Sequence, residues 1–251
     1  MINVENLTKQ FKAGSRVKVV LDNNSWSSGD GSITGFIGHN GAGKTTTLKI
    51  MTGSMRPSEG RILLNGKDIV KDPLEAKKQF GYVSDSPDHF LRLTGIEYLN
   101  FIADVYGVPA NVRTAFIREY SERFDIANAI GQSLLSYSHG MRQKLMIMAA
   151  LIHEPSIWIL DEPMTGLDPQ SAFELKKMMK EHAAKGHSVL FSTHVLEVAE
   201  KLCDQIVVIK QGQIIYDGTL ETLKGQYPED SDLEEIFLQM NGKMTQEEAD
   251  A

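Results

Sequence analysis

The stretch GHNGAGKTT, Gly38 to Thr46, follows the apolar segment SITGFI and precedes TLKIM. It matches the pattern G-x-x-x-x-G-K-[ST]. Gly41 and Gly43 let the backbone curl so that N–H groups face phosphate oxygens, while Lys44 can reach the β- and γ-phosphates and Thr45 can bind Mg²⁺. The stretch therefore predicts a phosphate-binding loop between a strand and a helix. The residues expected to surround the phosphates are Gly38, His39, Asn40, Gly41, Ala42, Gly43, Lys44, Thr45 and Thr46.

The composition is that of an ordinary globular protein. The 251 residues carry a net charge of −7, with 33 acidic and 26 basic residues, and no dense Lys/Arg run, which argues against a nucleic-acid partner. One cysteine, Cys203, excludes disulfides and Cys-based zinc sites within the chain. No signal peptide is visible at Met1, and the apolar runs are too short to span a bilayer. We expect a cytosolic protein that reaches a membrane only through a partner.

Apolar periodicity predicts the order of strands and helices. Strands are expected within 1–38 and in a hairpin at 60–69 that turns at Asn65-Gly66, and helices are expected at 41–51 and across 94–150. After these, strands at 156–160 and 187–192 flank a helix at 172–184, and a last hairpin covers 204–218. This βαβ order predicts an α/β fold whose parallel sheet is covered on both sides and is interrupted by a helical block.

Two carboxylates and a histidine follow apolar strands. The strand SIWIL runs into Asp161 and Glu162, and His194 follows HSVLFST. Ligands bind beyond the carboxyl ends of strands in open parallel sheets. We therefore expect Asp161 to hold Mg²⁺, Glu162 to polarise an attacking water as general base, and His194 to contact the γ-phosphate and that water. By itself, His194 would more often be a structural histidine.

Five motifs occur in one order along nearly the whole chain. They are the phosphate loop at Gly38, SYSHG at Ser136, ILDEP at Ile159, TGLDP at Thr165 and STH at Ser192. This combination resembles the ATP-binding cassette (ABC) family, specifically the ATPase subunits of transporters. The resemblance implies a P-loop NTPase core with a parallel sheet, an N-terminal antiparallel β subdomain and a helical subdomain inserted at about 86–150. Residues 1–225 would form the ATPase domain, and 226–251 a C-terminal helix and acidic tail.

In this family two cassettes face each other head to tail, and each ATP lies between one phosphate loop and the partner's signature segment. The matching segment here is YSHGM, Tyr137–Met141. It departs from the usual L-S-G-G-Q, because His139 replaces a glycine and Met141 a glutamine. Ser138 and Gly140 still offer a hydroxyl and a bare N–H at a helix start. The variant looks most like cassettes that serve exporters with separate membrane subunits.

The resemblance implies three further positions. Asp168 of TGLDP would reach across the dimer as the D-loop, and it could also cap the following helix. Phe11 would stack on adenine, the alternative being a core role. Asp85 stands where a glutamine that reaches Mg²⁺ is usual; it either keeps a metal role or is a plain loop residue.

The segment after Asp85 is where a multi-span permease would dock, near 86–107. Phe90, Leu91, Leu93 and Tyr98 would line the groove, or they form the core of the helical block. The helix expected at 232–240 would pack on its own domain.

The sequence thus predicts an ATPase that binds ATP and Mg²⁺, pairs with a second cassette, most simply its own copy, and powers export from the cytoplasmic face of the membrane. An importer subunit, or a translation or DNA-repair ATPase, is the alternative. A cassette does not reveal the transported substrate.

Overall fold

The computed structural model describes residues 1–14, 16–86, 90–228 and 231–247. The strands are β1 Ile2–Ala13, β2 Arg16–Ser28, β3 Ile33–Ile37, β4 Glu59–Leu64, β5 Lys67–Asp68, β6 Phe80–Val83, β7 Ile157–Asp161, β8 Ser188–Thr193, β9 Gln205–Lys210 and β10 Gln213–Thr219. The α-helices are α1 Lys44–Met51, α2 Pro73–Lys77, α3 Gly95–Val105, α4 Ala110–Arg123, α5 His139–Leu151, α6 Pro169–Ala184, α7 Leu196–Leu202, α8 Leu220–Lys224 and α9 Leu233–Glu247. Two short 3₁₀ turns, at Ala127–Ala129 and Leu134–Ser136, lie between α4 and α5.

A six-stranded sheet forms the centre, in the order β10-β9-β3-β8-β7-β6. Its strands β9, β3, β8, β7 and β6 pair in parallel, and β10 joins β9 antiparallel. Every residue of β3, β7 and β8 is buried. Their continuous apolar runs follow from helices or sheet covering both faces.

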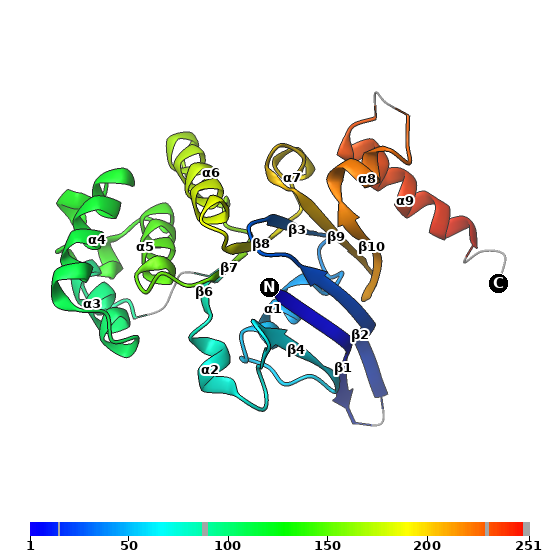
Figure 1. The fold of residues 1–251 in the computed structure, drawn as a ribbon, viewed down its shortest axis with the longest axis horizontal. Helices are drawn as coiled ribbons and strands as arrows, with labels where there is room; N and C mark the ends of the chain where they lie inside the picture. The colour runs from blue at the N-terminus through cyan, green and yellow to red at the C-terminus, as the bar shows by residue number, and fades with distance from the viewer. Residues whose placement is uncertain (15, 87–89, 229–230, 248–251) are drawn as a thin grey trace.

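A second, antiparallel sheet, in the order β2-β1-β4-β5, holds the N-terminal strands. The helices α3, α4 and α5 form a separate block between β6 and β7 in the chain (Figure 1). The predicted α/β class, with a parallel core sheet, an N-terminal antiparallel sheet and inserted helices, is confirmed. None of the helices in the described part of the chain is long and apolar enough to cross a bilayer.

The helix expected from Gly41 begins three residues later, at Lys44. Gly41 and Gly43 have φ angles of 83° and 117°, outside the right-handed helical region. The expected start was therefore wrong, because those glycines belong to the loop. The expected turn at Asn65-Gly66 is confirmed, with φ angles of 48° and 77°, which suit a tight hairpin.

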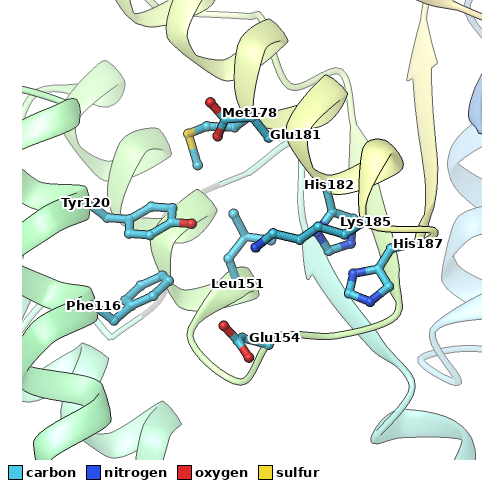
Figure 2. Close-up of a pocket in the computed structure, with 9 residues that line it drawn as sticks. All are labelled: Phe116, Tyr120, Leu151, Glu154, Met178, Glu181, His182, Lys185 and His187. Atoms are coloured by element: carbon cyan, nitrogen blue, oxygen red, sulfur yellow. The ribbon is translucent and has the colours of Figure 1, made fainter. Parts of the chain in front are cut away.

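Ion pairs join the inserted helices to the core. Arg123 at the end of α4 donates to Glu174 Oε1 at 2.5 Å and Glu181 Oε2 at 2.9 Å, both on α6. Next to it lies a cavity of about 100 Å³. Figure 2 shows Tyr120 of α4 and His182 of α6 among the residues that line this cavity. The ion pairs therefore fix α4 against α6 beside a small void.

Candidate active site

The phosphate loop joins β3 to α1 and needs its glycines for space as well as for conformation. A Cβ atom at Gly43 would lie 2.7 Å from Leu21 Cδ2, and one at Gly38 would lie 2.5 Å from the Ile209 carbonyl oxygen. Two backbone bonds hold the loop, from Ala42 N to His39 O at 3.1 Å and from Gly212 N to Ala42 O at 2.9 Å. The exposed part, 39–41, is left open to a ligand.

Lys44 is buried beneath this loop. Its Nζ donates to the Gly38 carbonyl at 2.5 Å and lies 3.6 Å from Glu162 Oε1. The loop therefore curls around the Lys44 ammonium group, which also lies close to the Glu162 carboxylate just after β7. This arrangement brings the two sequence motifs, 118 positions apart (162 minus 44), into one site.

Asp161 ends β7 and is fully buried. Its Oδ1 accepts a 2.5 Å hydrogen bond from Ser192 Oγ, whereas its Oδ2 has no hydrogen-bond partner among the described residues. Burial raises the pKa of this carboxyl, the hydroxyls of Ser192 and Thr45 lower it, and the Asp85 carboxylate raises it. The three residues expected at Mg²⁺, Thr45, Asp85 and Asp161, are thus electrostatic neighbours.

These residues fit a magnesium ion that a nucleotide helps to hold. No cluster of three or more His, Cys, Asp or Glu side chains suited to a metal occurs in the described ranges. Magnesium, however, commonly takes one or two protein carboxylates and completes its shell with phosphate oxygens and water. The unpartnered, buried Asp161 Oδ2 beside Thr45 is the kind of oxygen that such an ion uses.

Glu162 lies between Lys44 and His194. Its Oε2 is hydrogen-bonded to His194 Nδ1 at 3.0 Å, and its backbone N–H donates to Ser192 Oγ at 3.0 Å. Its φ of 47° is left-handed, an uncommon value for a residue other than glycine, and turns the chain after the strand. The sequence predicted a site role for Glu162 and another for His194, but neither their hydrogen bond nor the part played by Ser192, although the STH motif contains Ser192.

The signature segment, Tyr137–Met141, starts α5. Ser138 caps the helix by accepting from Met141 N at 3.2 Å, and its side chain is exposed together with His139. Gly140 is close to the D-loop, because a Cβ atom there would lie 2.6 Å from the Gly166 carbonyl oxygen. The segment and the D-loop of one chain therefore form a continuous surface.

Asp168 caps α6, as one of the two expectations for it stated. It accepts from Ser171 N at 2.9 Å and from Ser171 Oγ at 2.7 Å, and Lys144 Nζ of α5 lies 3.0 Å away. These hydrogen bonds, and then the Lys144 ammonium, hold the pKa of Asp168 well below its usual range. The proposed contact across a dimer stays a prediction.

For Phe11 and for the residues of the expected docking groove, the sequence left open whether the side chains belong to a binding site or to the core. Phe11 is 40% exposed on β1, so the core alternative is wrong for it, and adenine stacking stays a prediction. Tyr98 is only 6% exposed and belongs to the core of the inserted helices. Phe90 is exposed and its ring lies 5.6 Å from that of Tyr98. Residues 87–89 of the expected docking segment lie outside the described residues.

Comparison with known proteins gives consistent relatives. The sequence model of the ABC transporter family matches residues 21–165. The chain is 35% identical to the ABC-type transporter ATP-binding protein EcsA of Bacillus subtilis, over 96% of both chains. It is 34% identical to the ABC transporter ATP-binding protein NatA of the same organism, over 95% of this chain and 97% of NatA.

Solved structures of ABC transporter cassettes resemble this chain. One described as the ATP-binding subunit of an ABC transporter has a TM-score of 0.90 and 32% identity, covering 96% of this chain and 99% of that one. The dimeric MJ0796 cassette in a post-hydrolysis state with ADP and Pi has a TM-score of 0.78 at 23% identity, covering 88% and 99%. The second likeness shows the fold alone.

Proposed function

This chain belongs to the ABC transporter family as an ATP-binding subunit, and from that premise we propose that it hydrolyses ATP to drive export through a separate membrane permease. The observation that carries hydrolysis is the position of Glu162, whose two oxygens face Lys44 at 3.6 Å and His194 at 3.0 Å beside the buried Asp161. A carboxylate in that position is suited to accept a proton from water at a bound phosphate.

The phosphate loop and Lys44 would bind the phosphates of ATP. Thr45, Asp161 and Asp85 would hold Mg²⁺, which when bound neutralises charge on the phosphate oxygens. His194 would orient Glu162 through their hydrogen bond, and its other ring nitrogen would be available to the γ-phosphate. Phe11, exposed on β1, would cover the adenine.

A second copy of the chain would complete each site. Ser138, His139, Gly140 and Met141 stand at the N-terminus of the 13-residue helix α5, which favours an anion. Ser138 and His139 are exposed, so they are available to the ATP of a partner, with Asp168 at the same surface. MJ0796, which shares the fold, was solved as a dimer.

The direction of transport is inferred from relatives and from two features of the sequence. Relatives are named for daunorubicin resistance, DrrA3 of Streptomyces coeruleorubidus at 35% identity, and for multidrug transport, YbhF of Escherichia coli at 31%. The YSHGM variant of the signature segment and Asp85, which replaces the usual glutamine, also favour export. The permease would dock near 86–107, where Phe90, Phe101 and Val105 are exposed, and this would hold the protein at the cytoplasmic face of the membrane.

The first test is ATP hydrolysis by the purified chain and by Glu162→Gln. We expect hydrolysis to fall at least 100-fold in the variant while ATP binding persists, and the ATP-bound variant to elute as a dimer. Lys44→Ala is the control, because it removes the phosphate contact and should stay monomeric with ATP. A Glu162→Gln chain that hydrolyses ATP at the wild-type rate contradicts the general-base assignment.

The second test addresses the partner. Glu162→Gln with ATP and Mg²⁺ is used to capture partners from detergent-solubilised membranes of the host. Recovery of a multi-span permease supports transport, and reconstitution of that pair in vesicles gives the direction. Recovery of ribosomes or DNA-repair proteins, with no membrane subunit, would overturn it.

A further inference from the structure

The C-terminal helix α9 touches the phosphate loop directly. The ring of Phe237 lies against the ring of His39, with centroids 4.9 Å apart and planes inclined by 55°. Phe237 is 6% exposed, although it belongs to the last helix of the chain and His39 to an exposed loop. A tilted aromatic contact of this kind is favourable beyond the area that it buries.

The helix is firmly seated where it makes this contact. Leu233 and Ile236 are 1% and 0% exposed and belong to the main apolar core, and α9 packs against α7, which follows His194. A cavity of about 180 Å³ between α9 and the loop is lined by Gly38, His39, His194, Leu196 and Phe237, among others. Thus α9 borders both chain segments to which phosphate contacts are assigned.

The loop around His39 is held through its backbone. Backbone hydrogen bonds hold Ala42, and the Lys44 ammonium holds the Gly38 carbonyl. His39 takes part in this network through its carbonyl oxygen, which Ala42 N and Lys44 Nζ approach at 3.1 Å and 3.4 Å. A contact that fixes its ring therefore also restrains the peptide that curls around Lys44.

We propose that Phe237 is a positioning residue for nucleotide binding, which holds His39 and the adjoining loop in the form that receives the phosphates. The proposal rests on ATP being the ligand of this site. A loop that is ordered before binding loses less conformational freedom when the phosphates arrive. Phe237 itself does not touch the phosphates, so its effect falls on affinity rather than on the chemical step.

The test compares three substitutions in α9. Phe237→Leu keeps an apolar side chain but removes the ring, Phe237→Tyr keeps the ring, and Ile236→Ala removes a fully buried side chain one position away. With a fluorescent ATP analogue and Mg²⁺, we expect Phe237→Leu to weaken binding about 2- to 10-fold. We expect Phe237→Tyr to bind as the wild type does, and Ile236→Ala to lower the melting temperature without changing affinity.

Two further readouts separate positioning from general stability. In the nucleotide-free protein, Phe237→Leu should accelerate hydrogen exchange of the amides at 38–43, and Phe237→Tyr should not. In hydrolysis assays KM should rise with little change in kcat. A His39→Ala variant should make the Phe237→Leu substitution nearly silent, because the contact is already lost.

The outcomes distinguish this inference from the proposed function. Equal affinity and equal exchange in the wild type and Phe237→Leu, in a chain that hydrolyses ATP, would overturn positioning and leave the function standing. An equal loss in Ile236→Ala would assign the effect to helix packing and overturn it as well. Nucleotide binding without hydrolysis would contradict the function, while the affinity comparison would still decide the role of Phe237.

Discussion

Ser192 links the two acidic residues at the end of β7. Its hydroxyl donates to Asp161 Oδ1 at 2.5 Å and accepts from Glu162 N at 3.0 Å. One side chain on the neighbouring strand β8 thereby orients the residue proposed for the metal and the residue proposed as base. Removing this buried hydroxyl would lower the stability of the protein, because Asp161 and Glu162 would each lose a hydrogen bond.

Asp85 offers the sharpest test of the metal assignment. Its carboxylate is close enough to raise the pKa of Asp161, and two neighbouring carboxylates favour a divalent cation. We expect Asp85→Ala to raise severalfold the Mg²⁺ concentration that gives half-maximal ATP hydrolysis, and Asp85→Asn to raise it less. An unchanged Mg²⁺ dependence in Asp85→Ala would assign Asp85 to the loop alone.

His182 should make the protein less stable in mild acid. Burial, followed by the nearby His187 and Lys185, lowers the pKa of His182 to about 4. The unfolded chain takes up the proton near the ordinary value of about 6.5, so the contribution to stability is complete above that pH. It is lost as the pH falls toward 4.

Unfolding in urea at pH 7.0, 6.0 and 5.0 checks this expectation. His182→Gln should unfold with a smaller difference between pH 7.0 and pH 5.0 than the wild type. His153→Gln is the matched comparison, since burial also lowers the pKa of His153 to about 4, at a different contact with the core. A pH slope in His182→Gln equal to that of the wild type would mean that His182 is protonated alike in both states.

At the scale of elements, the cap of α6 can be separated from the ion pair of Asp168. Asp168→Ala removes both the cap on Ser171 and the contact with Lys144, whereas Asp168→Asn keeps a good capping side chain. We expect Asp168→Ala to lower the free energy of unfolding by about 1 kcal/mol, and Asp168→Asn by clearly less. Thermal unfolding of both variants measures this, and an equal loss would show that the charge on Asp168 matters more than the cap.

Local signals in the sequence predicted some elements well. Asn65-Gly66 specified a hairpin turn, and the apolar runs of β3, β7 and β8 specified buried strands. The helices α2, α7 and α8 were missed, because five to seven residues carry too little periodicity to reveal a helix.

Contacts between distant residues were beyond reach for a different reason. The pairs of Arg123 with Glu174 and of His39 with Phe237 join residues far apart in the sequence, and no local pattern marks either partner. The phosphate and carboxylate residues could be placed in one site because strand ends meet at one sheet edge. The hydrogen bonds of Ser192 to Asp161 and Glu162 could not be predicted, since a serine in an apolar strand has many possible roles.

At the scale of the whole molecule, a head-to-tail dimer can be tested by combining two inactive variants, because each ATP site is built from two chains. Lys44→Ala disables the phosphate loop, and Ser138→Asn alters the signature segment while keeping a helix cap. Neither variant alone can form a complete site in a homodimer. A mixed dimer has one complete site, formed by the loop of the Ser138→Asn chain and the signature of the Lys44→Ala chain.

We expect two inactive preparations to regain ATP hydrolysis when mixed, up to about half of the wild-type rate per mixed dimer. Mixing two differently tagged Lys44→Ala preparations is the control and should give none. Absence of any recovery, with mixed dimers shown to form through their tags, would contradict the shared site.

The position of β3 in the central sheet also governs when the site can exist during synthesis. β3, which leads into the phosphate loop, pairs only with β8 and β9 in the described sheet, and these end at Thr193 and Lys210. The phosphate loop is synthesised early, but both partners of β3 are present only after residue 210 of the 251 has been made. A nascent chain that stalls before β9 therefore carries the whole phosphate motif without the complete sheet that shapes it. Bound nucleotide can therefore stabilise the folding chain only after β9 has been made, because the phosphate loop has no complete sheet behind it until then.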